Sequence, residues 1–112
     1  EQGSFRILGR LSTDIIKTAG YKCSALEIER VLFEHNAIKE CAVLGVADDD
    51  LGERIVAVVV LHAAATLSLQ ELHAWLPEKL SRYKWPRALH FLQALPTRPT
   101  GKIDKLRLRN LL

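Results

Sequence analysis

An uninterrupted apolar run in the middle of the chain constrains the fold most. Residues 55–61 read Ile-Val-Ala-Val-Val-Val-Leu. β-Branched residues favour extended backbone, and consecutive apolar residues on a strand present apolar surface on both faces. The segment from Arg54 to His62 is therefore predicted to be a central strand with packed structure on each side. A second apolar stretch, Ile38 to Val46, predicts a mostly buried neighbouring strand.

Helix signals lie on either side of these strands. Ser24-Ala25-Leu26-Glu27 and Ser68-Leu69-Gln70-Glu71 both have the capping-box pattern, in which a serine hydroxyl and a glutamate carboxylate bond free amides at a helix start. The first predicts a helix to about His35. Pro77 interrupts the second, which predicts a kink or two short segments. In this second helix, apolar or aromatic residues recur at helical spacing: Leu69, Leu72, Leu76, Leu80 and Tyr83.

The remaining segments complete an α+β pattern. Residues 14–23 predict a β-hairpin that turns at Thr18-Ala19-Gly20, and Ala88 to Leu95 predicts a third long strand. Asp104 suits the N-cap of a last short helix with Leu108, Leu111 and Leu112 on its inner face. The predicted fold is a small N-terminal β-hairpin plus a three-stranded sheet covered by two or three helices.

Length and composition exclude several classes of protein. A chain of 112 residues with 48% hydrophobic content suits one domain, and it has no apolar run of the roughly 20 residues that span a bilayer. The polar N-terminus lacks the apolar core of a signal peptide. The chain starts without an initiator methionine, which predicts a cut inside a larger protein. Cys23 and Cys41 are isolated, which predicts reduced, half-buried thiols. The four histidines have no zinc-ligand spacing.

Charge is distributed unevenly along the chain. Residues 79–112 contain nine Lys or Arg and one acidic residue, a net +8, whereas residues 1–78 carry a net −5. The C-terminal third therefore predicts a cationic surface. Such a surface can meet nucleic acid, a membrane face or a phosphorylated small molecule, and charge alone does not choose among them.

One cation lies in a segment with a distinctive composition. Between Leu95 and Lys105 the prolines, threonines and Gly101 exclude a helix or a central strand, so this segment predicts an exposed loop that presents Lys102. On its own the loop is more typical of a basic turn before a terminal helix.

Paired with the segment from Gly9 to Glu29, the Gly101-Lys102 loop resembles the C-terminal lid domain of the adenylate-forming enzymes. These are the acyl-CoA synthetases, peptide-synthetase adenylation domains and beetle luciferases. Residues 14–29 are most similar to the malonyl- and methylmalonyl-CoA synthetases. Ala19 departs from this branch, which often has glycine there, and Asn36 and Ala47 stand where the wider family often has proline. Further matching motifs are Ala42–Asp48, Gly52-Glu53, Tyr83–Pro86 and Leu95-Pro96.

The resemblance implies roles for individual residues. Lys102 matches the catalytic lysine of acyl-adenylate formation, and Arg10 and Lys22 match nucleotide-binding positions. Residues 1–14 correspond to a lead-in and hinge segment, and residues 15–112 correspond to the lid. The positions that line the pantetheine tunnel for thioester formation are Gly20, Tyr21 and Lys22, and the hinge positions are Ser12, Thr13 and Asp14.

The resemblance also implies substrates and partners. ATP, CoA and a small carboxylate are the expected substrates, and an N-terminal ATP- and acyl-binding domain of the same chain is the expected partner. Mg²⁺ is expected in the full-length enzyme but not on this domain. Neither nucleic acid nor a membrane span is expected, and the expected compartment is the cytoplasm or the mitochondrial matrix.

Two other functions stay open on the sequence. One is a stand-alone basic α+β module that binds nucleic acid or another polyanion, and the other is a lid that delivers to a carrier protein instead of free CoA. Arg10 and Lys22 are also compatible with ordinary solvated hairpin residues. Glu27 and Glu29 are interpreted as helix-cap and surface residues, and Trp75 and Trp85 as packing residues.

Overall fold

The computed structural model describes residues 15–112. Arg10 and the expected hinge, Ser12 to Asp14, lie outside the described residues. The described elements are β1 (Ile15–Thr18), β2 (Tyr21–Ser24), α2 (Ala25–Leu32), β3 (Ile38–Asp48), β4 (Gly52–Leu61), α3 (Leu69–Trp75), the 3-10 helix η1 (Arg82–Lys84), β5 (Ala88–Phe91) and α4 (Lys105–Leu111).

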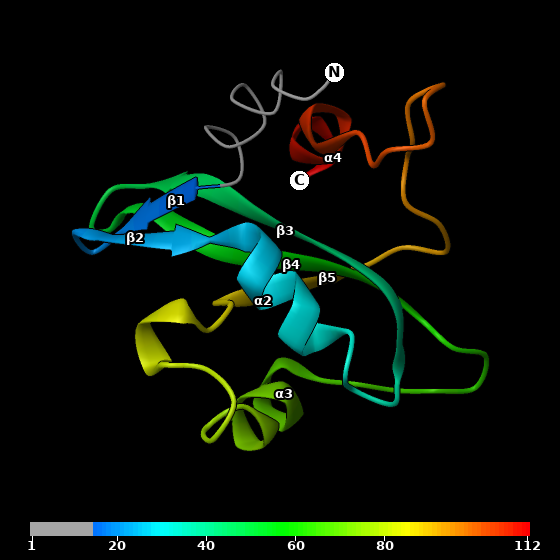
Figure 1. The fold of residues 1–112 in the computed structure, drawn as a ribbon, viewed down its shortest axis with the longest axis horizontal. Helices are drawn as coiled ribbons and strands as arrows, with labels where there is room; N and C mark the ends of the chain where they lie inside the picture. Colours follow the sequence, from blue (N-terminus) through cyan, green and yellow to red (C-terminus); the bar gives the residue numbers. More distant parts are fainter. Residues whose placement is uncertain (1–14) are drawn as a thin grey trace.

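The long antiparallel pair of β3 and β4 forms the centre of the sheet (Figure 1). The strand order is β2-β1-β4-β3, and β5 also pairs with β4, in parallel, along Val56–Val59. The hairpin formed by β1 and β2 joins this sheet through one residue pair, Thr18 with Gly52. The predicted hairpin and the predicted three-stranded sheet are thus parts of one five-stranded sheet.

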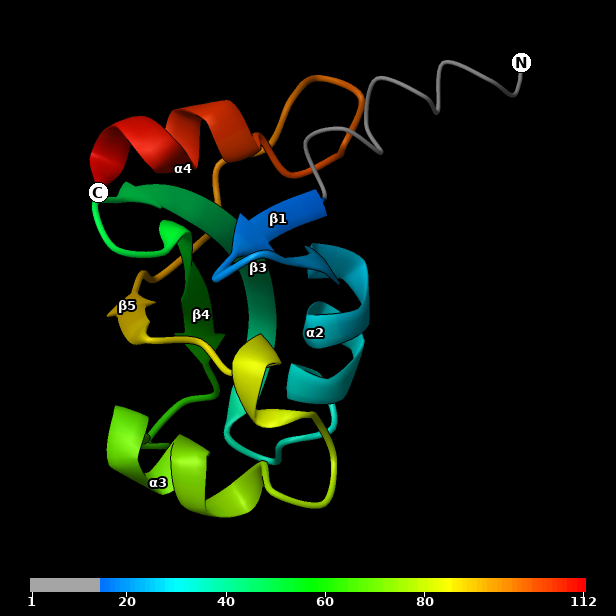
Figure 2. The same cartoon turned by 90° about the vertical axis from the view of Figure 1, so that its left-hand side faces the viewer.

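Both faces of the β3–β4 pair are buried, as the apolar run predicted. One face packs under α2, α3 and the hairpin, and the other packs under the segment that leads into α4. Figure 2 shows α3 and α4 at opposite ends of the molecule with the sheet between them. The β3 and β4 residues of the first cluster are Ile38, Cys41, Val43, Ile55, Ala57 and Val59, and those of the second are Ala42, Leu44, Val58 and Val60.

The helices begin where the capping residues predicted. Ser68 and Glu71 form a complete capping box, with the Glu71 amide donating to Ser68 Oγ at 3.1 Å and the Ser68 amide donating to Glu71 Oε1 at 2.8 Å. At α2 the Ser24 hydroxyl accepts from the Glu27 amide at 3.3 Å. The Glu27 carboxylate, however, accepts from Lys84 Nζ, so the predicted box is only half formed. The chain splits at Pro77 as expected, into α3 and η1.

Two predictions were wrong: where the last strand ends, and which leucines α4 buries. The predicted strand from Ala88 to Leu95 ends at Phe91, because the chain then crosses to bury Leu95 in the second cluster. The predicted inner face of α4 is reduced to Leu108, which is fully buried. Leu111 and Leu112 are 62% and 43% exposed, because they lie one turn further along, where no described element covers them.

The two thiols are free and buried, which confirms their role as small hydrophobes, and they are buried more completely than predicted. Burial raises the pKa of Cys41 to about 12, with the nearby Glu29 carboxylate adding to the effect. Within residues 15–112, no helix combines the length and apolarity needed to cross a membrane.

The turn between β1 and β2 has an unusual backbone. Both of its central residues have positive φ, 53° at Ala19 and 85° at Gly20. Two positive φ values are the signature of a type I′ hairpin turn, which favours glycine or asparagine at both positions. Ala19 therefore holds a conformation that costs about 1 kcal/mol for a residue with a Cβ atom.

We expect Leu108→Ala to lower the free energy of unfolding of the chain by about 2–3 kcal/mol, since it leaves a cavity in the second cluster. Leu111→Ala deletes the same atoms from an exposed position of the same helix and should change it by less than about 0.5 kcal/mol. Urea unfolding followed by circular dichroism measures both. Equal losses would show that α4 packs differently.

We expect Ala19→Gly to stabilise the chain by about 0.5 kcal/mol, because relief of the left-handed strain exceeds the added entropy of the unfolded chain. Ala63→Gly is the matched control: Ala63 is exposed and has no positive φ, so glycine there should be neutral or destabilising. The same urea titration compares them, and a loss of stability in Ala19→Gly would contradict the turn assignment.

Candidate functional site

The loop that carries Lys102 has a defined backbone. Thr97 pairs with Ile103 across its base, and the Asp104 amide donates to the Pro96 carbonyl at 2.8 Å. Inside the loop the Arg98 amide donates to the Lys102 carbonyl at 2.7 Å, and Gly101 turns the chain with a φ of 90°. Lys102 follows this turn and is exposed. The loop therefore holds its lysine outward on an ordered turn.

The base of this loop is buried although its tip is exposed. Leu95 and Ile103 pack into the second cluster beside Leu108. Asp104 caps α4 by accepting from the Arg107 amide at 3.1 Å, as the sequence predicted, and it lies 4.0 Å from Arg98 Nε. The position of Lys102 is thus set by how α4 and the loop base pack on the sheet.

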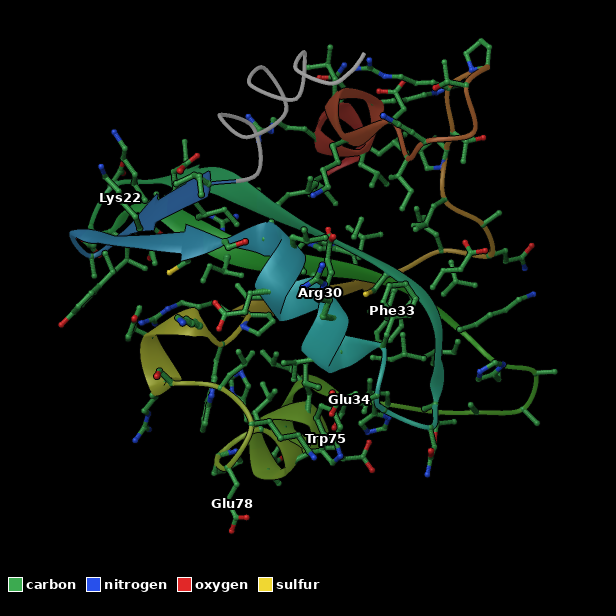
Figure 3. All side chains as sticks on the ribbon, viewed as in Figure 1. Lys22, Arg30, Phe33, Glu34, Trp75 and Glu78 are labelled. Carbon is green, nitrogen blue, oxygen red and sulfur yellow. The ribbon has the colours of Figure 1, made fainter. Side chains whose placement is uncertain are left out.

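The hairpin turn carries the other predicted group of site residues. Gly20 faces open space, since an added Cβ would meet no atom within 4 Å. Lys22 is exposed on the same hairpin (Figure 3). Tyr21 stacks on Tyr83 of η1, with ring centroids 4.2 Å apart. The Tyr83 contact was missed from the sequence, because no local pattern links residues so far apart along the chain.

Backbone hydrogen bonds and one carboxylate hold the hairpin on the sheet. The Ala19 amide donates to the Leu51 carbonyl at 2.9 Å, and the Lys17 amide donates to Glu53 Oε1 at 2.9 Å. Glu53 has room for this contact because Gly45 lacks a side chain: a Cβ there would lie 2.9 Å from Glu53 Oε2. These contacts therefore hold the hairpin against the start of β4 in addition to the single strand pair between Thr18 and Gly52.

The segment around η1 adds cations beside the hairpin. Lys84 Nζ lies 3.0 Å from Glu27 Oε1, and this hydrogen bond raises the pKa of Lys84. The indole of Trp85 donates to the Leu80 carbonyl at 3.0 Å, and the Arg82 guanidinium lies over its ring. A pocket of about 290 Å³ opens here, lined by His73, Arg82, Trp85, Pro86 and Arg87.

That pocket combines two guanidinium groups with an indole, a chemistry that suits an anionic group next to a planar ring. The prediction that the tryptophans pack is confirmed, since Trp75 and Trp85 both lie against the first cluster. In the part of the chain that the structure describes, no group of three or more His, Cys, Asp or Glu side chains is placed to hold a metal ion.

The interpretation of Glu29 as a surface residue was wrong. Its side chain is only 13% exposed, and its Oε2 accepts from the Val43 amide at 2.8 Å and lies 2.9 Å from Lys105 Nζ. The sequence does not show that Lys105, at the start of α4, lies against this side of α2. Lys84 and Lys105 are therefore both paired with acids of α2, so the cationic surface carries less free charge than the sequence count indicates.

The two groups of predicted site residues are far apart. In Figure 1 the hairpin turn lies at the left edge of the molecule, and the loop after β5 that carries Lys102 lies at the upper right. Tyr21 of the hairpin contacts Tyr83 of η1, whereas the loop that carries Lys102 lies away from the hairpin turn. The domain thus presents two separate surfaces on one sheet.

Comparison with known proteins shows which family this chain belongs to. The model for the AMP-binding enzyme C-terminal domain matches residues 27–102. The malonate–CoA ligase of Arabidopsis thaliana is 42% identical over all of this chain, which spans 20% of that protein. A human protein named as a mitochondrial malonate–CoA ligase is 45% identical over 94% of this chain and 18% of its own length.

Solved structures agree with the sequence relatives. ATP-bound MatB from Rhodopseudomonas palustris has a TM-score of 0.84 and 31% identity over 89% of this chain and 20% of that chain. The acyl-CoA synthetase of Brucella canis has a TM-score of 0.81 and 33% identity over 88% of this chain and 19% of that chain. The chain therefore spans about a fifth of the length of these relatives, and it belongs to the family of AMP-binding enzyme C-terminal domains.

Proposed function

We propose that this domain is the mobile lid of an ATP-dependent acyl-CoA synthetase. The observation that carries the proposal is the separation of two ordered, exposed loops on one sheet: the Lys102 loop and the Gly20 hairpin. A rigid domain with two such surfaces suits two successive half-reactions, because turning the domain exchanges one surface for the other. The hinge would lie at Ser12 to Asp14, between a lead-in of residues 1–14 and the lid of residues 15–112.

In the first half-reaction a carboxylate oxygen attacks the α-phosphorus of ATP, and the bond to pyrophosphate breaks. The two reactants are both anions and repel each other. An ammonium group such as Lys102 placed between them offsets this repulsion and the charge that develops in the transition state. One such contact at about 4 Å contributes roughly 4 kcal/mol at an intermediate effective dielectric constant. Lys102 is exposed and held on an ordered turn, which suits this role.

In the second half-reaction the sulfur of CoA attacks the acyl carbon, the bond to AMP breaks, and the thiol proton is released. The open space around Gly20 suits passage of the pantetheine arm, and the stacking of Tyr21 on Tyr83 keeps that ring to one side. Lys22, together with Arg10 from the lead-in, would contact nucleotide phosphates. The cationic pocket near Trp85 has the charge that phosphate groups need.

The expected substrates and partners follow from this proposal. Malonate is the first carboxylate to test, because two of the relatives above are named malonate–CoA ligases. ATP and CoA are the other substrates, and the partner is an N-terminal ATP- and acyl-binding domain of the same chain. Mg²⁺ would accompany ATP. The name of the human relative makes the mitochondrion the first compartment to examine, ahead of the cytoplasm.

The comparisons do not favour the alternative of a stand-alone polyanion-binding module, since the named relatives above are CoA ligases. Delivery to a carrier protein is a variant of the proposed function that uses the same two surfaces.

In the full-length enzyme, Lys102→Ala should lower malonate-dependent ATP–pyrophosphate exchange roughly 100- to 1000-fold, because it removes the cation between two anions. Thioester formation from supplied malonyl-adenylate should change less than about threefold. Arg109→Ala, which removes an exposed cation from α4, is the control and should leave both rates unchanged. Equal loss of both half-reactions in Lys102→Ala would contradict the assigned role.

Two glycines allow a matched test of the two surfaces. Gly20 and Gly101 have similar positive φ values, 85° and 90°, and both face open space, so leucine introduces comparable strain at either. In the full-length enzyme Gly20→Leu should lower mainly the CoA step, by about 10-fold or more, and Gly101→Leu mainly adenylation. Single-turnover kinetics of the two half-reactions measure this, and loss of the same half-reaction in both variants would refute the assignment.

A further inference from the structure

Glu29 is a partly buried carboxylate at the point where α2, β3 and α4 meet. Its Oε2 lies 2.9 Å from Lys105 Nζ and accepts from the Val43 amide at 2.8 Å. The side chains of Glu29 and Lys105 are only 13% and 21% exposed. Such shielding from water makes this charge pair stronger than an exposed one, and it makes an unpaired carboxylate there costly.

The contact with Val43 fixes Glu29 to the sheet. β3 is the last strand in the order β2-β1-β4-β3, so within residues 15–112 one of its edges has no strand partner. The Val43 amide would otherwise lack an acceptor on that side, and the carboxylate supplies one. The position of Glu29 is thereby set by the long β3–β4 pair at the centre of the sheet.

The contact with Lys105 transmits that position to α4. Lys105 is the first residue of α4 and lies three positions after Lys102. The intervening residues close the base of the loop, through the Thr97–Ile103 pair and the hydrogen bond from the Asp104 amide to the Pro96 carbonyl. α4 buries only one of its leucines, so its apolar packing alone leaves its orientation weakly defined.

We propose that Glu29 is a positioning residue for Lys102: through Lys105 it holds the start of α4, and so the base of the Lys102 loop, against β3. The inference rests on the proposed function, because it assigns to Glu29 a part in the adenylation half-reaction. The Glu29–Lys105 contact links the segment that ends at Glu29 to the loop that carries Lys102. Glu29 touches neither substrate nor the reacting atoms in this role.

The test uses the full-length enzyme. Glu29→Gln keeps an oxygen that accepts from the Val43 amide but removes the charge that attracts Lys105. We expect the kcat of malonate-dependent ATP–pyrophosphate exchange to fall roughly 10- to 100-fold, because small displacements of a catalytic group cost this much. The KM for ATP and the rate of thioester formation from malonyl-adenylate should each change less than about threefold.

Three further variants separate positioning from general destabilisation. Lys105→Arg keeps the charge and should retain adenylation, whereas Lys105→Gln should reproduce the loss. The double variant Glu29→Gln/Lys105→Gln should be no slower than either single variant, because both remove the same contact. Glu34→Gln makes the same chemical change at an exposed position just after α2 (Figure 3) and should have no effect.

The outcomes decide between this inference and the proposed function. An equal fall in both half-reactions with a lower melting temperature, or unchanged adenylation in both Glu29→Gln and Lys105→Gln, would overturn the positioning role. Lys102→Ala measured alongside is the reference. If Lys102→Ala also leaves adenylation intact, the proposed function itself fails, whereas loss in Lys102→Ala alone overturns only the role of Glu29.

Discussion

The burial of β4 on both faces is the constraint on which the rest of the structure depends. The strand is apolar at every position from Ile55 to Val60, so neither face tolerates water and each must be covered. The α2 and α3 helices and the hairpin cover one face, and the segment from Leu95 to Leu108 covers the other. The hairpin belongs to the structure that covers the first face, and the Lys102 loop belongs to the segment that covers the second. Their separation across the molecule is thus a consequence of packing a two-sided sheet.

Carboxylates connect each of the two candidate functional loops to that sheet. Glu53 accepts from the Lys17 amide beside the hairpin, and Glu29 pairs with Lys105 beside the Lys102 loop. In both cases the acid also lies close to β3, against Gly45 or the Val43 amide. Backbone and ionic contacts of this kind are directional, unlike apolar packing, and a catalytic group needs a defined direction. The exposed loop tips then present their side chains without themselves being buried.

The sequence predicted the elements better than their ends. Ser24, Ser68 and Asp104 cap helices as expected, because capping depends on a few neighbouring residues. The length of β5, the single buried leucine of α4 and the contacts of Glu29 were predicted wrongly, since each depends on what another part of the chain covers. For the candidate site, the motifs identified Lys102, Gly20 and Lys22, but the Tyr21–Tyr83 stack and the Glu29–Lys105 pair join residues distant in the chain.

By itself the sequence determined the α+β class, the central position of β4, the helix starts and the family of the domain. These follow from local chemistry: apolar periodicity, capping side chains and motifs whose residues lie close together along the chain. Only the tertiary structure decided that the hairpin and the three strands form one sheet, that the Lys102 loop is an ordered turn with a buried base, and that Glu29 lies inward. Those outcomes depend on which distant surfaces exclude water from one another, and no short stretch of sequence contains that information.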